Sequence, residues 1–529
     1  MNHFQILKEC DATLIRVANK TLEDRLLGRF YTPQTIVASM VRKLLPHLRN
    51  KEVIRVCDPF AGDGRLVLKL TQELNAKYRK VQIETQLWDC DERDLAPAAE
   101  RIKRVDGNIV VSTMVTDSFN YVATTDSIFD VVITNPPWEI LKPDHRELGS
   151  LDNTARVRYI EQLKQQDTQI RQDFCHSQPA RKISGWGTNL SRVGLEASLR
   201  LLAPNGLLAI VLPASFCADD NSTQLRKWLV ENFDIKSADY YPAEAKLFAG
   251  VDQSFVTLLA QAGTPTKSFI GRNYMPESGK LSKPYSSTPL DTDGYRLNVG
   301  PAIVVGRVFH ALPCLGQFEG LNDGQWWFGR ELDETRDKPF LSDVSGVPFV
   351  KGRAITAFEE PKNTGLYLNT RLRAAPRTSR FLRVAWRDVS RPTMRRRMCA
   401  TIVEPNSVSG NSLNIAMANS GQLQHARALC VLMNSVWFEA QVRAWSHTSH
   451  VSAGTVRKVR VPNLLDDGVL AKLASLYPGG EADIKEPERE AGVAAVYGLS
   501  KSEMKQLLTF FPRLEAETKK AILNARIGN

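Results

Sequence analysis

Short apolar runs alternate with amphipathic segments between about residue 50 and residue 262. Short apolar, β-branched runs are typical of buried strands, and apolar residues recurring every three or four positions are typical of helices. The predicted strands are VIRVCD (53–58), QIETQLWD (82–89), IFDVVITN (128–135), GLLAIVLP (206–213) and SFVTLLAQ (254–261). The predicted helices include 64–78 and 190–206, the second ending at Pro204-Asn205-Gly206. This alternation predicts an α/β fold, a doubly wound and mostly parallel sheet with helices on its faces.

The rhythm of strands and helices is interrupted twice. Residues 141–190 form a long polar stretch, which we expect to hold a solvated helix beside the strand that ends at Asn135. Residues 263–300 are rich in Ser, Pro, Gly and Lys, a composition typical of a linker. We therefore expect a first domain over 1–290, a mixed α+β domain over 300–465 and a helical C-terminal segment over 466–529.

Composition narrows the class of protein. The 529 residues contain no run of about 18 apolar residues, so we expect no membrane span, and the N-terminus lacks the apolar core of a secretory signal. The eight cysteines are scattered singly and form no C-x-x-C pair. This pattern favours reduced thiols in a cytoplasmic protein and argues against a structural zinc site, so we expect no bound metal.

The positive charge of the chain is confined to one segment. The formal net charge is +11, but residues 351–463 carry 18 Lys and Arg against 5 Asp and Glu. The remaining residues carry 51 basic and 53 acidic side chains and are close to neutral. A basic segment in an otherwise neutral protein indicates a surface that binds a polyanion.

A glycine-rich turn, DPFAGDG (58–64), follows the first predicted strand and precedes a helix. Small residues at such a turn let a ligand approach the backbone, and ligands of doubly wound sheets bind beyond the carboxyl ends of the strands. An acidic residue that ends the next strand commonly binds ribose hydroxyls, and here Asp89 takes that position with Asp91 in reserve. Taken alone, the turn is equally compatible with a purely structural role.

The combination of this turn with NPPW (135–138), some seventy residues later, resembles the amino-methyltransferase family, which transfers a methyl group from S-adenosylmethionine to an exocyclic nitrogen. The upstream segment GRFYTPQTIVASMV (28–41) resembles the family's Thr-Pro motif, and VTDSFN (115–120) resembles its Asp-Phe motif. This motif order resembles the gamma-type adenine-N6 DNA methyltransferases of type II restriction–modification systems. The resemblance spans about residues 24–262 and implies a Rossmann-like catalytic domain over 1–290.

The resemblance implies a set of site residues. The cofactor-binding positions are Tyr31, Thr32, Pro33, Asp58, Phe60, Ala61, Gly62, Gly64, Asp89 and Asp117. Ser118 interrupts the Asp-Phe motif before Phe119. The catalytic positions are Asn135, Pro136, Pro137 and Trp138, and Phe248 matches a residue that packs near the extruded base.

The chemistry of an amino group fits the NPPW sequence. Hydrogen bonds from both N6 protons of adenine to the Asn135 side-chain oxygen and the Pro136 carbonyl would favour a tetrahedral nitrogen and aim its lone pair at the methyl group. A base inside a duplex cannot reach such a site, so the target must be flipped out. Stacking on Trp138 would then offset part of the energy of flipping, by about 1–3 kcal/mol.

The basic segment is expected to be a target-recognition domain for double-stranded DNA, because arginine suits bidentate contact with phosphate and guanine. Residues 371–397 contain ten arginines and one acid, Asp388, within FLRVAWRDV (381–389) and neighbouring strand-like sequences. The segment 445–463 is a second expected contact surface. The expected DNA-binding residues are Arg387, Arg391, Arg395, Arg396, Arg397, Arg457 and Lys458.

Other functions remain open at this point. The same tetrad occurs in methyltransferases that act on cytosine N4, on RNA guanine or on a protein glutamine, and a catalytically silent DNA-binding specificity protein could keep the same fold. Intact Asn135, Asp58 and Gly62 argue against the silent protein. The favoured function is a site-specific DNA adenine-N6 methyltransferase of a restriction–modification system, with a restriction endonuclease encoded separately.

Overall fold

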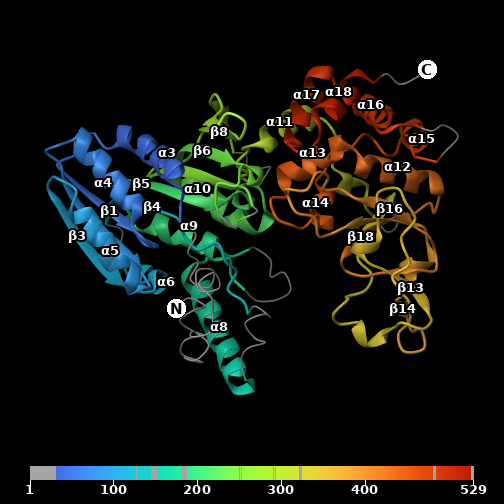
Figure 1. The fold of residues 1–529 in the computed structure, drawn as a ribbon, viewed down its shortest axis with the longest axis horizontal. Coiled ribbons are helices and arrows are strands. Elements are labelled where there is room, and N and C mark those ends of the chain that lie inside the picture. The colour runs from blue at the N-terminus through green and yellow to red at the C-terminus, as the bar shows by residue number, and fades with distance from the viewer. Residues whose placement is uncertain are drawn as a thin grey trace. The chain divides into compact units, whose positions relative to one another are not determined.

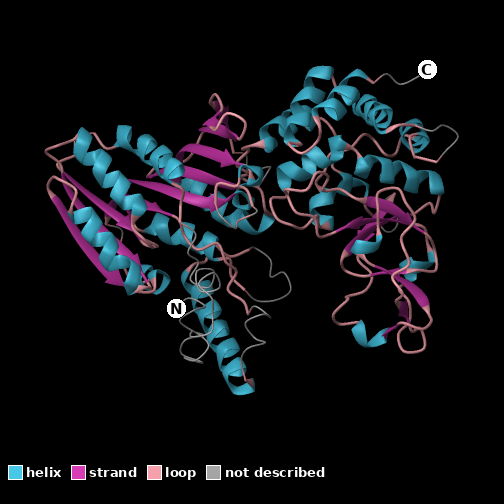
Figure 2. Cartoon of the chain, viewed as in Figure 1, coloured by secondary structure: helices cyan, strands magenta, loops and turns pink. Residues whose placement is uncertain are grey.

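The computed structural model divides into two compact units between Val299 and Gly300. The residues that it describes are 31–49, 51–126, 128–143, 152–179, 187–248, 251, 253–289, 291, 294–320, 325–479 and 484–525. Figure 2 shows helices and strands in both units. In the described part of the chain, no helix is both long enough and apolar enough to cross a membrane.

The first unit is built on one large sheet with the strand order β10-β8-β6-β7-β5-β4-β1-β2-β3, and β9 pairs with β8 (Figure 1). The strands are β1 Val53–Asp58, β2 Gln82–Asp89, β3 Ile109–Val115, β4 Phe129–Thr134, β5 Leu202–Pro213, β6 Phe233–Tyr241, β7 Phe255–Ala262, β8 Phe269–Met275, β9 Lys280–Leu281 and β10 Tyr285–Ser287. β3, β2, β1, β4 and β5 pair in parallel, and β7 runs antiparallel between β5 and β6. The predicted α/β class is confirmed.

Helices cover both faces of this sheet. They are α3 Gln34–Leu44, α4 Arg65–Lys77, α5 Glu92–Lys103, α6 Ser118–Val122, α8 Asn153–Asp173, α9 Leu190–Arg200 and α10 Thr223–Asn232. Figure 1 shows α4 and α5 running along one face. Successive residues of β4 alternate between the two cores, because Val131 and Ile133 pack with α3, α4 and α5 whereas Val132 packs with α8, α9 and α10. A strand buried on both faces explains the unbroken apolar run before Asn135.

Two sequence expectations need correction in this unit. The expected linker 263–300 contains β8, which pairs with β6 and extends the sheet. Its glycine, Gly271, lets β10 approach closely, because a Cβ there would lie 2.2 Å from the Tyr285 ring. The second predicted helix ends at Arg200 rather than at Pro204, and β5 begins two residues later. The polar stretch does form a helix, α8, but Tyr159 and Leu163 of that helix are buried.

The second unit has a mixed α+β architecture, as expected for residues 300–465. One sheet has the order β11-β18-β15-β16, and a smaller one has the order β12-β14-β13-β17. The strands are β11 Trp326–Gly329, β12 Leu341–Ser342, β13 Val347–Val350, β14 Tyr367–Leu368, β15 Arg383–Arg387, β16 Ala400–Val403, β17 Val408–Ser409 and β18 Leu413–Ala418. The helices are α11 Pro301–Phe309, α12 Leu423–Asn434, α13 Val436–Trp445, α14 Ala453–Arg457, α15 Asp467–Ser475, α16 Glu486–Tyr497, α17 Lys501–Leu507 and α18 Ala516–Asn524.

The C-terminal helical segment is part of the second unit. Leu470, Tyr497 and Ile522 lie in the same hydrophobic core as Trp386 and Trp437. Residues 466–525 therefore stabilise the fold of the arginine-rich region rather than forming a separate core.

Candidate active site

The sequence motifs of the first unit meet at one edge of its sheet. Asp58, Asp89 and Thr134 are the last residues of β1, β2 and β4, and these strands are parallel neighbours in the order β4-β1-β2. The carboxyl ends of parallel strands lie at the same edge, so the glycine-rich turn and the NPPW sequence leave the sheet side by side.

A hydrogen bond joins these two motifs directly. Thr134 Oγ1 donates to Asp58 Oδ1 at 2.6 Å, and the Phe60 amide donates to the same oxygen at 3.1 Å. Asp58 is fully buried, and its other oxygen, Oδ2, has no hydrogen-bond partner among the described residues. Burial raises the pKa of the Asp58 carboxyl to about 7, although both hydrogen bonds act to lower it. The buried carboxylate is thus a strong acceptor that lacks one donor.

The glycine-rich turn is held closely against the end of β2. Gly62 and Gly64 have φ angles of +47° and +70°, a conformation that favours glycine. The Gly62 amide donates to Asp89 Oδ2 at 2.8 Å, and the Ala61 amide donates to the Trp88 carbonyl at 2.9 Å. A Cβ on Gly64 would lie 2.7 Å from the Ala98 side chain, so the turn cannot accept a larger residue there without moving α5.

The two acids proposed for ribose binding have different positions. Asp89 is largely buried, and burial raises the pKa of its carboxyl. Its Oδ1 also accepts the Asp91 amide at 3.0 Å, so the carboxylate shapes the turn as well as facing the edge of the sheet. Asp91 caps α5 by accepting the Arg93 amide at 3.1 Å and pairs with the Arg93 side chain. Asp89 is therefore the better placed of the two.

Arg65 connects the Thr-Pro segment to the turn, a role that the sequence reasoning did not assign. Its Nη1 donates to the Thr32 carbonyl at 3.1 Å, while its Nε and Nη2 bind the Asp63 carboxylate. The guanidinium lies 4.8 Å from the centre of the Tyr31 ring, and a Cβ on Gly62 would lie 3.5 Å from that ring. Tyr31 and Thr32 are thus held over the glycine-rich turn. Pro33 follows as the N-cap of α3.

The interrupted Asp-Phe motif has a structural explanation. Asp117 caps the short helix α6 by accepting the Phe119 amide at 3.0 Å. The inserted Ser118 donates its hydroxyl to the Pro59 carbonyl, which ties α6 to the glycine-rich turn. The Phe119 ring is buried 5.2 Å from the Phe60 ring. The Phe119 ring therefore packs against the Phe60 ring, whereas Asp117 stays partly exposed at the end of β3.

The NPPW residues, which follow the last residue of β4, are tightly packed. Asn135 is half-buried, Pro136 is buried and Pro137 is half-buried. A Cβ on Gly194 of α9 would lie only 2.3 Å from Pro136 Cβ and 3.5 Å from the Phe60 ring. Gly194 therefore allows the motif and the turn to approach α9 together. A glycine inside a helix is unfavourable by about 1 kcal/mol relative to alanine. Gly194 within a predicted helix was therefore the sequence signal that could have indicated this close approach.

The rings of Trp138 and Phe248 lie next to each other. Their ring centres are 5.4 Å apart, and Phe255 of β7 lies 6.2 Å from Trp138. Phe248 is 5% exposed, whereas Trp138 is only half-buried. The indole nitrogen of Trp138 is buried and has no partner among the described residues. The aromatic group next to Asn135 therefore consists of a partly open indole supported by two phenyl rings.

The residues around the turn fit S-adenosylmethionine. The Asp58 Oδ2 and Thr32 Oγ1 atoms are both buried and lack partners in the described part of the chain. Buried polar atoms are normally paired, so such atoms mark places for donors of a ligand. Gly62 and Gly64 carry no side chain, so the backbone of this turn is open to a ligand.

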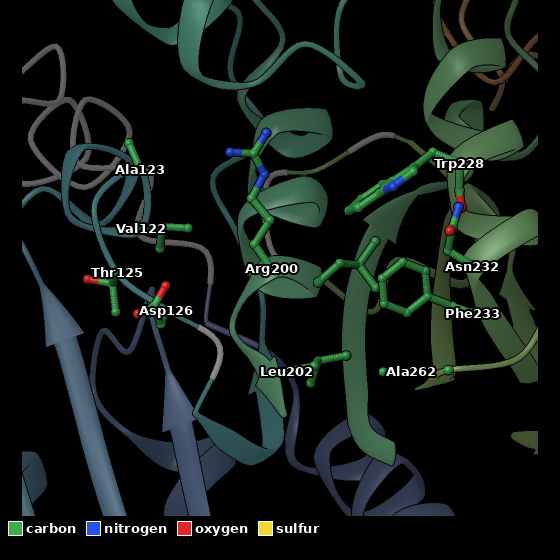
Figure 3. Close-up of a pocket in the computed structure, with 12 residues that line it drawn as sticks. Val122, Ala123, Thr125, Asp126, Arg200, Leu202, Trp228, Asn232, Phe233 and Ala262 are labelled. Atoms are coloured by element: carbon green, nitrogen blue, oxygen red, sulfur yellow. The ribbon is translucent and has the colours of Figure 1, made fainter. Parts of the chain in front are cut away.

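The cavity drawn in Figure 3 lies at the opposite edge of the same sheet. It has a volume of about 460 Å³ and is lined by the first residues of β5 and β6, Leu202 and Phe233, together with Arg200 and Trp228. It is therefore separate from the turn and the NPPW sequence.

A group of three possible metal ligands lies on neighbouring elements, where atoms of Cys175, His176 and Glu196 lie within 4.8 Å of one another. Glu196 already accepts the Ser177 amide at 2.7 Å and pairs with Arg200. We assign this group no role in the reaction.

Two of the arginines expected to bind DNA are structural instead. Arg397 is 1% exposed and donates to the backbone carbonyls of Thr448 at 2.6 Å and Ser390 at 3.1 Å. Arg396 donates to Glu439 at 2.9 Å and is 22% exposed. The expectation that these two residues contact phosphate is wrong, because their guanidinium groups are already used to hold the core of the second unit.

The other expected DNA contacts differ in exposure. Arg391 and Arg395 are exposed, and Lys458 is half-buried. Arg387 donates to the Gly352 carbonyl at 3.0 Å and to the Ile355 carbonyl at 2.8 Å. Arg457 forms a two-bond pair with Glu319. Of the arginines in the expected set, only Arg391 and Arg395 combine high exposure with no recorded partner for the guanidinium.

Part of the chain matches a known protein family. Residues 13–179, about a third of the chain, match the family model for N-6 DNA methylase. By this match the chain contains an N-6 DNA methylase domain. Its cofactor is S-adenosylmethionine, which agrees with the buried acceptors beside the glycine-rich turn.

Two solved structures resemble nearly the whole of this methyltransferase. The type IIL restriction–modification enzyme MmeI in complex with DNA is 13% identical, with a TM-score of 0.53 over 96% of this chain and 80% of that chain. The ATP-dependent type ISP enzyme LlaBIII bound to DNA is 12% identical, with a TM-score of 0.51 over 89% of this chain and 41% of that chain. At these identities the likeness concerns the fold.

Proposed function

We propose that this methyltransferase modifies the N6 atom of an adenine flipped out of a specific DNA duplex, as the modification activity of a restriction–modification system. The observation that supports the proposal is the Thr134–Asp58 hydrogen bond, because it joins the strand end before Asn135 to the glycine-rich turn at one edge of the sheet. A reaction that joins a methyl donor to an amino group needs both sites within reach of each other.

In this proposal the chain's own residues orient the amino group. The Asn135 side-chain oxygen and the Pro136 carbonyl accept its two protons, which favours a tetrahedral nitrogen. Neither group needs to be strongly basic, because the proton is lost only after the nitrogen has become cationic. S-adenosylmethionine supplies the electrophilic methyl group when bound. The contribution of the protein is orientation and preorganised acceptors, the kind of effect that is worth several kcal/mol.

Asp58, Thr32 and Tyr31 are proposed to hold the methionine end of the cofactor. The Asp58 carboxylate offers a buried oxygen that suits an ammonium group, and Thr32 offers a buried hydroxyl. Asp89 and Asp117, which follow β2 and β3, would bind the ribose and the adenine of the cofactor. Phe60, which packs against the Phe119 ring, would contact the cofactor.

The proposed place of the target base is beside the indole of Trp138. Flipping a base out of a duplex costs about a few kcal/mol, and stacking on an aromatic ring returns about 1–3 kcal/mol. The Phe248 and Phe255 rings support the indole from behind. Phe248 is buried in this structure, so its proposed role is to hold Trp138 near the base.

We further propose that the second unit recognises the DNA sequence, that the protein works in the cytoplasm and that a separate endonuclease cleaves the unmodified site. The two similar folds belong to restriction–modification enzymes described as bound to DNA, which supports a duplex as the partner. The basic segment 351–463 is consistent with this role.

The experiment is long-read sequencing of DNA from cells that express the protein and lack other adenine methylation. We expect N6-methyladenine at every copy of one short sequence. N4-methylcytosine at such a sequence would show that the target is cytosine N4 and not adenine N6. If the DNA is unmodified although calorimetry shows that the protein binds the cofactor, the protein is a DNA-binding specificity protein without transfer activity.

A further inference from the structure

A buried carboxylate in the second unit holds two exposed basic side chains. Asp388, which follows β15, is 6% exposed. Its Oδ1 accepts Arg330 Nη2 at 2.8 Å and Asn414 Nδ2 at 2.9 Å, while its Oδ2 lies 2.7 Å from His450 Nδ1. Both oxygens are therefore occupied, and each of the two basic groups is fixed at one end only.

Arg330 presents one complete edge of its guanidinium to the outside. Nε donates to Asn414 Oδ1 at 2.9 Å and Nη2 donates to Asp388, so both bonds lie on the Nε–Nη2 edge. The opposite edge consists of Nη1 and the second N–H of Nη2. Nη1 has no hydrogen-bond partner among the described residues, and the side chain is 45% exposed. An arginine held in this way has little rotamer freedom left to lose on binding, and its outer edge matches a bidentate acceptor pair.

His450 is held on the same carboxylate. A carboxylate oxygen can only accept, so Nδ1 carries the proton and Nε2 points away from Asp388. The ring is 61% exposed, although the backbone is anchored by a β-bridge between His450 and Val389. Ser446 also donates to the His450 carbonyl at 2.7 Å. The imidazole is thus a polar group in a defined orientation at the surface.

The surface beside this network has the composition of a DNA-contacting face. The segment after Asp388 exposes Val389 and Met394 between the exposed Arg391 and Arg395. The Ser390 amide donates to the Ser449 carbonyl at 2.7 Å, which keeps this segment next to His450. Phosphates attract exposed arginines, and apolar groups suit the thymine methyl group in the major groove.

The arginine-rich sequence by itself did not point to this surface. Arg383 and Arg397, both in the run of ten arginines, are buried and bind backbone carbonyls. Arg330 lies outside that run and outside the basic segment, yet its outer edge is free to meet a ligand. Its position next to Asp388 becomes visible only when β11 and β15 are placed on either side of β18.

We propose that Arg330, positioned by Asp388 and Asn414, reads the major-groove edge of a guanine in the recognition site, with His450 contacting a neighbouring base edge and Arg391 and Arg395 contacting phosphates. Guanine presents two acceptors, N7 and O6, at the spacing of an arginine fork. The inference rests on the proposed function, since it names how the methyltransferase would select its sequence. Asp388 acts through Arg330 and is a positioning residue.

The test measures sequence preference separately from affinity. Wild type and the variants Arg330→Ala, Arg330→Lys and Asp388→Asn methylate a duplex library with each position of the recognition site randomised, and sequencing reports the modified molecules. Arg330→Ala should lower the preference for guanine at one position by about 10- to 100-fold and leave the other positions unchanged. Arg330→Lys should not restore it, and Asp388→Asn should weaken the preference at the same position.

Controls keep the outcome interpretable. Arg336→Ala removes another exposed arginine that pairs with an aspartate, Asp337, and should leave every preference unchanged. The unfolding temperature of Arg330→Ala should stay near that of wild type, because the side chain is half exposed. If wild type methylates the library and Arg330→Ala shows the same base preference at every position, the inference is overturned. Absence of methylation by wild type would instead overturn the proposed function.

Discussion

Thr134 and Asp58 end two neighbouring parallel strands, and the Thr134 hydroxyl donates to the Asp58 carboxylate at 2.6 Å. This bond makes the last residue before Asn135 a determinant of the charge at the glycine-rich turn. Because Asp58 is fully buried, the protonation of its carboxyl depends on a few nearby donors, of which Thr134 is the strongest. The proposed cofactor contact at Asp58 and the proposed amine contact at Asn135 are therefore linked through the Thr134 side chain.

The affinity for S-adenosylmethionine should depend on pH around neutrality. The pKa of Asp58 is raised to about 7, so the carboxyl is protonated below that pH and ionised above it. Only the ionised form attracts an ammonium group, so affinity should fall as pH falls below about 7, and binding should release protons near that pH. Calorimetry from pH 5.5 to 8.5 in buffers of different ionisation enthalpy measures both. Affinity that is constant over this range would contradict the assignment of Asp58.

Replacing Thr134 with Val should move this pH profile upward. The variant removes a hydrogen bond that stabilises the ionised carboxylate, so the pKa of Asp58 rises further. A bond to a charged group contributes about 1.5–3 kcal/mol, which corresponds to roughly one pH unit or more. Thr134→Ser keeps the hydroxyl and should keep the wild-type profile. Identical profiles for Thr134→Val and wild type would show that the bond does not control the charge.

Arg65→Ala should weaken cofactor binding without changing the chemistry. Loss of the guanidinium releases the Thr32 carbonyl and the Tyr31 ring from the turn. We expect the KM for S-adenosylmethionine to rise by about tenfold with little change in kcat, since one charge-assisted bond is lost. Lys69→Ala, on the same helix and paired with Glu73, serves as the matched control. An unchanged KM in Arg65→Ala would remove Arg65 from the site.

Gly194→Ala should impair transfer rather than cofactor binding. The added Cβ would lie 2.3 Å from Pro136 Cβ, so Pro136 and Asn135 must shift. Displacement of a positioning group by about 1 Å can lower kcat by about 100-fold, while cofactor affinity should stay within about twofold. Gly306→Ala, in α11, is the control and should not affect activity, because the new Cβ would meet no neighbouring element within 4 Å among the described residues. Wild-type kcat in Gly194→Ala would show that the NPPW sequence tolerates movement.

The arginines of the second unit should separate into two classes. Arg397→Ala leaves buried carbonyls without donors and should reduce the free energy of unfolding by about 3 kcal/mol or more. Arg395→Ala should leave stability unchanged and lower the slope of log affinity against log salt by about 1, as expected for one lost phosphate contact. Chemical denaturation and salt titration of DNA binding measure the two effects. The reverse pattern would refute the division.

The sequence predicted the core of the fold well where periodicity and chemistry agreed. The bounds of β1 and β2 were predicted to the residue, because each apolar run ends at an acid or a turn. The extra strand β8 was missed because Gly271 and the nearby polar residues resemble a linker, and the reason for that glycine is the Tyr285 ring on another strand. Contacts between distant strands leave no local pattern in the sequence.

The candidate site shows the same division. The motifs pointed to Asp58, Gly62 and Asn135 as candidate residues, because each lies in a short sequence with distinctive residues. Residues that act through distant contacts were not found, among them Arg65 with Thr32 and Gly194 with Pro136. The arginine run predicts a polyanion as the ligand, but the sequence did not show which arginines are exposed, since burial of Arg397 depends on the loop 446–450.

The central claim is that Asn135 orients an adenine of duplex DNA for methyl transfer. The most direct measurement incubates wild type and Asn135→Ala with duplex DNA and S-adenosylmethionine labelled in the methyl group, and then identifies the labelled nucleoside by mass spectrometry. We predict N6-methyldeoxyadenosine from wild type, none from Asn135→Ala, and nearly equal cofactor affinity in both by calorimetry. Labelled N4-methyldeoxycytidine, or wild-type yields of labelled adenine from Asn135→Ala, would contradict the account.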